Sequence, residues 1–169
     1  GLDGENIGRR ILARSPVIQT YLAMRRPAPP VAVSPEHATV WEAEHACATV
    51  PFEIGTDADA AGGAYLWVPE IGGQSSGGGG RATYRLQVGR AGQYHLEGRV
   101  LTPTPEDDSF FLSVRAADGS ELLPETLWSP GVFTAWAWRA VKSPGQKGAA
   151  AIELPQGEVT LILRPREPG

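Results

Sequence analysis

Apolar and polar residues alternate with a period of two in eight short segments that begin after residue 38. Successive side chains of a strand point to opposite faces, so this alternation predicts strands with one buried face. Clusters rich in Gly, Pro, Asp and Ser separate the segments, and short strands at this spacing predict an all-β fold, a β-sandwich jelly roll. The predicted strands are 39–46, 64–68, 81–88, 93–101, 109–115, 134–141, 149–154 and 158–164.

The first 26 residues predict a helix rather than a strand. Ser15 is a good N-cap residue, Pro16 suits the first helical position, and Pro27 ends the helix. The apolar residues that follow the N-cap at helical spacing are Val17, Ile18, Tyr21 and Leu22. A short helix is marginal alone, so we expect it to dock either on its own domain or on another protein subunit.

The Pro-rich stretch after this helix divides the chain into three parts. Pro-rich sequences are stiff and extended, so residues 27–37 predict a linker. The expected organisation is therefore a helical N-terminal arm at 1–26, the linker at 27–37 and the β-sandwich at 38–169.

Charge is distributed unevenly over a chain whose net charge is −4. Residues 1–30 hold five arginines against two acidic residues, a balance of +3, and residues 31–169 hold ten basic against seventeen acidic residues, a balance of −7. Nucleic-acid binding needs clustered positive charge, so no nucleic-acid partner is expected for the body. No run of about 18 apolar residues occurs, so no transmembrane segment is predicted. The single cysteine, Cys47, excludes an internal disulfide.

One short stretch matches the sequence pattern of a catalytic serine motif. The sequence GQSSG at 73–77 matches the G-x-S-x-G pattern of a nucleophile elbow. That elbow needs a strand before it and a helix after it, whereas here more glycines and a predicted strand follow. The three histidines show no recognisable triad or metal-ligand spacing. We therefore expect a chain that is not an enzyme.

Trp136 and Trp138 are two positions apart in a predicted strand, so both indoles share one face. Such a pair either belongs to the core or forms a platform on which the apolar face of a sugar ring stacks. Asp108, at the end of a predicted loop, either caps that loop or presents a polar group to a ligand.

Glu42 and Glu44 are likewise two positions apart in the sequence WEAEHA, and a strand there would place both carboxylates on one face. Like charges at this distance repel unless both are solvated or both hold a cation. A hard cation such as calcium prefers oxygen ligands of this kind. A solvated surface pair and a calcium site both remain open on these residues alone.

Taken in order, several segments resemble the carbohydrate-binding modules of families 6 and 35, over about residues 38–169. The segments are WEAEHA (41–46), GTDADAAGGAYLWVP (55–69), AGQYHLEGRV (91–100), DDSFFLSV (107–114), FTAWAWRAV (133–141) and LPQGEVTLILRPREPG (154–169). These modules are galactose-binding-like jelly rolls, so the resemblance implies that fold here.

The resemblance also implies two sites. Modules of these families hold a structural calcium with acidic residues of an E-A-E or Q-A-E segment, which makes Glu42 and Glu44 the candidate metal ligands. An Asp in a segment after the REPG motif usually completes that calcium shell, and the sequence ends at Gly169. Family sugar sites use aromatic residues and an Asn or Asp on loops at one end of the sandwich. The nearest positions here are Tyr65, Asp108, Phe133 and Trp136.

Two functions are therefore expected. The first is a non-catalytic module that binds a polysaccharide or other glycan through loop aromatics, in an extracellular, cell-surface or periplasmic protein. The second is a structural or accessory subunit of a larger envelope or extracellular assembly, docked on other protein subunits through residues 1–30. Fold alone does not decide between them.

Overall fold

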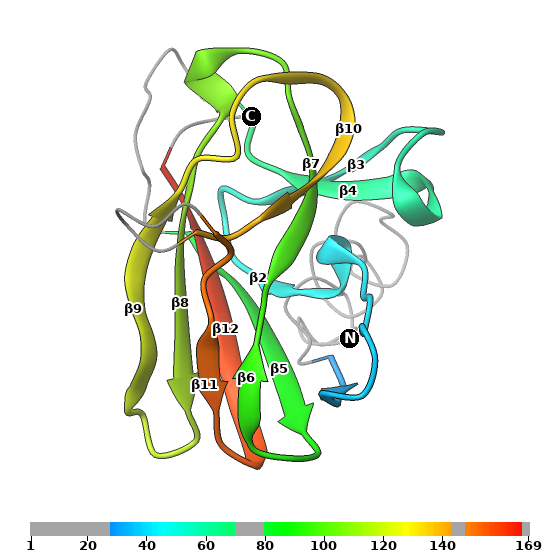
Figure 1. Ribbon diagram of the computed structural model, residues 1–169. Helices are drawn as coiled ribbons and strands as arrows, with labels where there is room; N and C mark the ends of the chain where they lie inside the picture. Colours follow the sequence, from blue (N-terminus) through cyan, green and yellow to red (C-terminus); the bar gives the residue numbers. More distant parts are fainter. Residues whose placement is uncertain (1–27, 70–79, 143–147, 167–169) are drawn as a thin grey trace, which may run out of the picture.

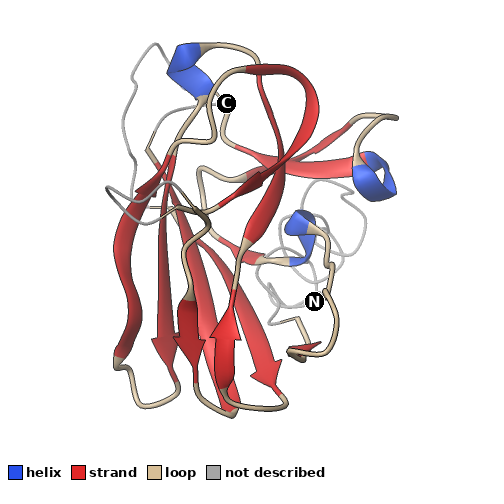
Figure 2. Ribbon diagram, viewed as in Figure 1, coloured by secondary structure: helices blue, strands red, loops and turns tan. Residues whose placement is uncertain are grey.

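The computed structural model describes residues 28–69, 80–142 and 148–166 (Figure 1). These residues form twelve strands and three short 3-10 helices, which confirms the predicted all-β sandwich (Figure 2). None of the described helices has the length and hydropathy to cross a membrane. The strands are β1 Val31–Val33, β2 Cys47–Ala48, β3 Glu53–Thr56, β4 Ala64–Trp67, β5 Ala82–Val88, β6 Gly92–Tyr94, β7 Glu97–Thr102, β8 Phe110–Ala116, β9 Glu121–Trp128, β10 Phe133–Ala140, β11 Ile152–Leu154 and β12 Gly157–Pro165. The helices are η1 Ala43–His45, η2 Ala61–Gly63 and η3 Pro105–Asp107.

The larger sheet has the order β1-β5-β12-β8-β9, and β2 also pairs with β5. Its long strands are antiparallel, whereas β1 runs parallel to β5. Alternation decides which face of this sheet is buried: Leu161 of β12 pairs with Tyr84 of β5 and with Val114 of β8, and all three side chains are buried. The intervening residues of the same strands therefore form the outer face of the sheet.

The remaining strands pair two by two, β7 with β10, β6 with β11 and β3 with β4. In Figures 1 and 2, β6 and β11 lie in front of the larger sheet as a second layer. Ile152 and Leu154 of β11 share one hydrophobic cluster with Val159 and Leu161 of the larger sheet. The core therefore fills the space between the two layers.

The predicted strand at 39–46 is wrong. Residues 43–45 form η1, and the chain becomes extended again only in the two-residue strand β2. The physical reason is a tertiary contact. The hydroxyl group of Tyr84 donates a hydrogen bond to the carbonyl oxygen of Ala43 over 2.9 Å, whereas in a strand that carbonyl would accept a hydrogen bond from the backbone of a neighbouring strand. Glu42 and Glu44 thus do not share a strand face, although their side chains do converge, as described below.

Besides β2, three strands were not predicted. β1 lies in the segment expected to be linker, and it joins the sheet because the N–H of Gly89 donates to the carbonyl of Val33 over 2.9 Å. β3 has only four residues, and β9 contains Pro124, which normally argues against a strand. The single strand predicted at 93–101 is divided into β6 and β7. The helix predicted at 1–26 lies outside the described residues.

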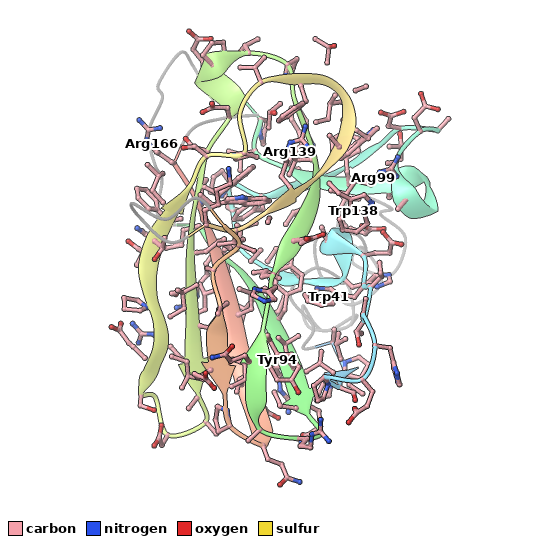
Figure 3. All side chains as sticks on the ribbon, viewed as in Figure 1. Trp41, Tyr94, Arg99, Trp138, Arg139 and Arg166 are labelled. Carbon is pink, nitrogen blue, oxygen red and sulfur yellow. The ribbon has the colours of Figure 1, made fainter. Side chains whose placement is uncertain are left out.

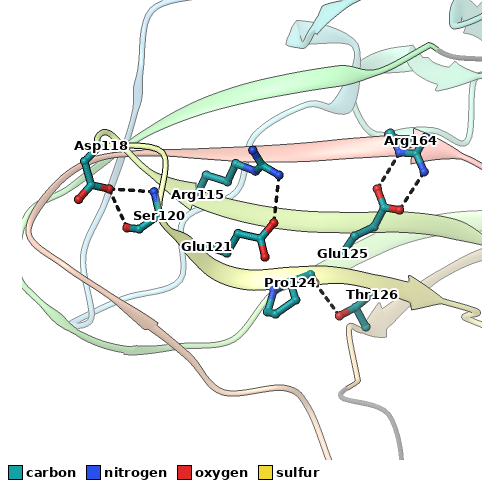
Figure 4. Close-up of polar contacts among 8 residues, drawn as sticks. All are labelled: Arg115, Asp118, Ser120, Glu121, Pro124, Glu125, Thr126 and Arg164. Atoms are coloured by element: carbon teal, nitrogen blue, oxygen red, sulfur yellow. Dashed lines mark hydrogen bonds and ion pairs between the residues drawn. The ribbon is translucent and has the colours of Figure 1, made fainter.

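β9 is an edge strand of the larger sheet and shows how a proline is accommodated there (Figure 4). Its register with β8 is irregular between the pairs of Leu112 and Val114, and the hydroxyl of Thr126 donates to the carbonyl of Pro124 over 2.8 Å. An edge strand needs hydrogen bonds on one side only, so a missing N–H is tolerated. Charges on the outer face, Arg115 with Glu121 at 3.0 Å and Arg164 with Glu125 at 2.7 Å, also discourage further pairing along this edge.

Candidate functional site

Three aromatic rings from β4 and β10 form a continuous row. The ring centroids of Tyr65 and Trp136 are 5.6 Å apart in an edge-to-face arrangement, and those of Tyr65 and Trp67 are 6.5 Å apart. Trp138 follows Trp136 on the same strand, at the spacing that returns to the same face. We call Tyr65, Trp67, Trp136 and Trp138 the aromatic cluster.

A glycine makes room for the central ring of this cluster. Gly55 of β3 lies opposite Tyr65 of β4, and a Cβ atom on Gly55 would be 2.3 Å from Cζ of the Tyr65 ring. Non-bonded atoms do not approach one another this closely, so the phenol ring lies directly over the backbone of β3. The absence of a side chain at Gly55 therefore decides where Tyr65 lies.

The loop after β3 holds the indole of Trp136. Its Nε1–H donates to Oδ2 of Asp57 over 2.9 Å, and Oδ1 of Asp57 accepts the backbone N–H of Asp59 over 2.9 Å. The hydrogen bond from the Asp59 N–H, with that from Trp136, holds the pKa of Asp57 below its ordinary value. The ring of Trp136 is thus held at its edge by a carboxylate that stays ionised.

A cation lies beside the same rings. The guanidinium carbon of Arg99 is 5.8 Å from the ring centroid of Trp136, and its NH2 group donates to the carbonyl oxygen of Asp59 over 3.0 Å. Arg99 of β7 lies directly opposite Trp138 of β10 (Figure 3). The side chain of Trp138 is 49% exposed, so the cluster presents a large apolar surface to solvent beside a guanidinium donor.

The four residues predicted for sugar binding do not all join this cluster. The structure brings Tyr65 and Trp136 into contact. Phe133, the first residue of β10, packs instead against Arg139, whose guanidinium carbon is 3.8 Å from the ring centroid of Phe133. Asp108, partly exposed, follows η3 in the loop between β7 and β8. The sugar-binding roles of all four residues stay predictions.

Sequence reasoning missed Trp67, Arg99 and the role of Asp57. Trp67 had a readable signal, since it is two residues after Tyr65 and therefore shares its strand face. Arg99 and Asp57 had none, because they reach the cluster only through the pairing of β7 with β10 and through the loop after β3.

The two glutamates of the WEAEHA segment lie around a glycine of η2. A Cβ atom on Gly62 would lie 3.6 Å from the carboxyl carbon of Glu42 and 3.7 Å from Oε1 of Glu44. Gly62 has a φ of +66°, a conformation that favours glycine, so both carboxylates approach a bare backbone. Oε2 of Glu44 is buried and has no hydrogen-bond partner among the described residues.

A buried tyrosine borders this acidic site. Tyr84 donates its hydroxyl to Ala43, and burial, with the charge of Glu44 as a second cause, raises the pKa of Tyr84 far above its ordinary value. A buried carboxylate oxygen without a donor is costly, and a cation is one means of compensating it. Within the described part of the chain, no third His, Cys, Asp or Glu side chain joins this pair to form a metal-binding group.

No protein-family model and no curated protein sequence matches the chain. Solved structures do match its fold. One is an exo-β-1,3-galactanase from Phanerochaete chrysosporium bound to β-1,3-galactotriose, with a TM-score of 0.51 and 16% identity. Another is an isomalto-dextranase from Arthrobacter globiformis T6 bound to panose, with a TM-score of 0.53 and 16% identity.

Each match covers 73% of this chain but only 24% of the galactanase and 20% of the isomalto-dextranase. The chain thus spans about a quarter or less of the length of these proteins. Both are carbohydrate-active enzymes with a β-sandwich-type domain. At this level of identity, the likeness establishes the fold.

Proposed function

We propose that the chain is a non-catalytic glycan-binding module whose binding surface is the aromatic cluster. The observation that carries the proposal is the half-exposed indole of Trp138, which lies beside Arg99 on a face that already holds Trp136 and Tyr65. An exposed, rigid aromatic surface beside a directed polar group is typical of a site that binds an amphipathic ligand.

Sugar rings fit the chemistry of this surface. A pyranose has an apolar C–H face, which packs on an indole, and a rim of hydroxyl groups, which accept hydrogen bonds from a guanidinium. Trp138 would supply the stacking surface, and Arg99 would donate to a hydroxyl or ring oxygen. The N–H of Trp136 already donates to Asp57, so it would not bind the sugar directly. The ring of Trp136 would instead pack against Tyr65 and Arg99 and hold them in position.

The structural neighbours support a carbohydrate ligand in general terms. One was solved with β-1,3-galactotriose and the other with panose, both oligosaccharides of neutral hexoses. Neutral hexose polymers are therefore the first ligands to test. An extracellular, cell-surface or periplasmic location fits such ligands.

Calcium is proposed as a structural ion at the acidic site. Glu42 and Glu44 would hold it, since both carboxylates approach Gly62 and one buried oxygen of Glu44 has no described donor. The remaining ligands would come from backbone carbonyl oxygens or water, which calcium accepts readily. Its role would be to hold η1 close to the loop that carries η2.

Retention on polysaccharides in native affinity gels tests the binding proposal. Galactans and α-glucans are the first panel, and Trp138→Ala is the decisive variant. We expect Trp138→Ala to abolish the retardation of the wild-type protein, with an unchanged melting temperature because the side chain is half-exposed. Leu127→Ala is the matched control, since Leu127 of β9 is 45% exposed on the outer face of the larger sheet, away from the aromatic cluster. Equal retardation of both variants and wild type would overturn the proposal.

A further inference from the structure

We infer that the outer face of the larger sheet holds a second ligand site, a groove that binds an organic acid with one carboxylate and an apolar body. The groove has a volume of about 440 Å³, which is within the range of small-molecule sites. Its described lining comes mainly from β5, β12 and the segment of Cys47 and Thr49. None of these residues belongs to the aromatic cluster, so the groove is a site separate from the proposed glycan site.

Strand pairing brings the lining side chains together on one face. Along β5 every second residue is buried, so Arg81, Thr83 and Arg85 point outward. On β12, Ile162 pairs with Thr83, and Thr160 pairs with Arg85. These side chains therefore form two adjacent rows, about 5 Å apart, on the outer face of the sheet. Most of the exposed wall of the groove is apolar, which suits a ligand with an apolar body.

The other arginines of this face are matched by carboxylates. Arg85 donates two hydrogen bonds to Glu158, with N–O distances of 3.1 Å and 2.6 Å. These hydrogen bonds lower the pKa of Glu158, so its carboxylate stays ionised and balances the charge of Arg85. Figure 4 shows the same balance elsewhere on the sheet, in the pairs Arg115–Glu121 and Arg164–Glu125. Arginines that are paired in this way offer little charge to an anionic ligand.

Arg81 is the exception in the groove. Its side chain is exposed, and its guanidinium has no hydrogen bond or ion pair with any residue that the structure describes. Its backbone is held by Thr49: the N–H of Arg81 donates to Oγ1 of Thr49 over 3.0 Å, and its carbonyl oxygen accepts the N–H of Thr49 over 2.9 Å. The base of the side chain is thus fixed while the guanidinium donors are available. A guanidinium binds a carboxylate through two parallel hydrogen bonds.

Two hydroxyl groups lie beside this guanidinium. Thr83 is two positions after Arg81 on the same face, which corresponds to a Cα–Cα distance of about 7 Å. Thr160 is the diagonal neighbour of Thr83 across the strand pair, at about 7–8 Å. Within the described part of the chain, neither hydroxyl group has a hydrogen-bond partner. Both are therefore available to donate to a carboxylate oxygen that Arg81 holds.

The balance of charge selects the kind of anion. One uncompensated guanidinium matches a single negative charge, whereas a phosphate or a polyanion would need further cations. Residues 31–169 hold ten basic against seventeen acidic groups, a balance of −7, which repels polyanions as a whole. The shared chemistry of the ligand is thus a monocarboxylate on an apolar body. It is either a free organic acid or the C-terminal carboxylate of a peptide that ends in an apolar residue.

Titrations of the full-length, ¹⁵N-labelled protein followed by NMR test this site. The probes are hexanoate, hexanamide as its uncharged analogue of equal length, and N-acetyl-leucine as a mimic of a peptide C-terminus. The signals to follow are the side-chain Nε–H of Arg81 and the backbone N–H groups of Thr83 and Thr160. We expect hexanoate to shift these signals in a saturable manner, with an affinity about tenfold or more above that of hexanamide, because only the carboxylate forms charge-assisted hydrogen bonds.

Two variants separate the groove from a general effect of charge. Arg81→Gln should reduce the affinity for hexanoate to that for hexanamide. Arg90→Gln is the matched control, since it removes the same charge from an arginine that pairs with Glu36 at 3.1 Å and does not line the groove. Arg90→Gln should bind hexanoate as the wild-type protein does.

Three results would overturn the inference: no saturable shift with hexanoate, equal affinities for hexanoate and hexanamide, or unchanged binding by Arg81→Gln. Where hexanoate binds as expected, the third probe identifies the source of the carboxylate. Tighter binding of N-acetyl-leucine supports the site and assigns it to a peptide C-terminus. Weaker or equal binding supports the site and assigns it to a free organic acid.

Discussion

Trp136 donates its indole hydrogen to Oδ2 of Asp57 over 2.9 Å, although the two residues are 79 positions apart in the chain. This bond ties β10 to the loop after β3, and Asp57 also organises that loop by accepting the N–H of Asp59. One carboxylate thus connects the shape of a loop to the orientation of an indole in the aromatic cluster.

We predict that Asp57→Ala shifts the fluorescence of Trp136 to longer wavelength and weakens glycan retention, because the indole loses the acceptor that orients it. Intrinsic fluorescence and native affinity gels measure the two effects. Asp59→Ala is the control, since Asp59 contributes backbone groups to the cluster. Identical behaviour of the two variants would show that the bond from Trp136 does not orient the ring.

The same bond predicts a dependence on pH. Because the pKa of Asp57 in the folded protein is lowered, its contribution is present above the ordinary pKa of an aspartate, about 3.9, and is lost as pH falls through the lowered value. The difference in melting temperature between wild type and Asp57→Ala should therefore shrink as pH falls below about 4. A difference that stays constant down to the acid limit of folding would contradict this assignment.

Gly55→Ala should displace the ring of Tyr65, because the added Cβ would lie 2.3 Å from Cζ of that ring. We expect a loss of stability of about 1–3 kcal/mol, as for other overpacked sites, together with weaker glycan retention. Urea denaturation measures the first effect. Gly92→Ala is the matched control, since a Cβ on Gly92 meets nothing within 4 Å. A Gly55→Ala protein as stable as Gly92→Ala would mean that Tyr65 moves aside freely.

Calcium should raise the melting temperature of the wild-type protein, and chelation should reverse the increase, because an ion that binds only the folded state stabilises it by mass action. Glu44→Gln should remove most of this response, since it removes the charge of the carboxylate whose Oε2 is buried. Glu53→Gln, on an exposed residue of β3, should leave the response intact. An unchanged melting temperature of the wild-type protein at millimolar calcium would exclude the proposed ion.

Tyr84→Phe should lower the free energy of unfolding by about 1–3 kcal/mol, because it leaves the carbonyl of Ala43 without its hydroxyl donor. The raised pKa of Tyr84 also predicts how the free energy of unfolding changes with pH. Stability from the neutral phenol is present below the ordinary tyrosine pKa, about 10, and is lost as pH rises above it. Wild type should therefore lose more stability than Tyr84→Phe in alkaline denaturation, and equal losses would contradict the burial of this phenol.

Alternation of apolar and polar residues was sufficient to predict the sandwich, and it succeeded best at β5, β8, β10 and β12. In β5 every second residue is buried, so the period-two pattern in the sequence reports directly on the two faces of the strand. Alternation also predicted that Trp136 and Trp138 share a face. These are local properties of a strand, and the sequence contains them.

Tertiary structure alone decided the strands with weak local patterns. β9 tolerates Pro124 because it is an edge strand, and β1 extends within a Pro-rich segment because β5 offers a free edge. Conversely, the segment of Glu42 and Glu44 forms η1 because Tyr84, from a distant strand, holds the carbonyl of Ala43. Strand pairing is a property of two segments, so neither segment shows it alone.

The same division applies to the candidate site. The sequence by itself determined which residues are aromatic and which of them share a strand face. Only the tertiary structure decided that Tyr65 contacts Trp136, that Arg99 lies opposite Trp138, and that Phe133 packs on Arg139 instead. The reason is that these contacts depend on the register between β7 and β10 and on the space above Gly55, both of which arise when distant segments pack.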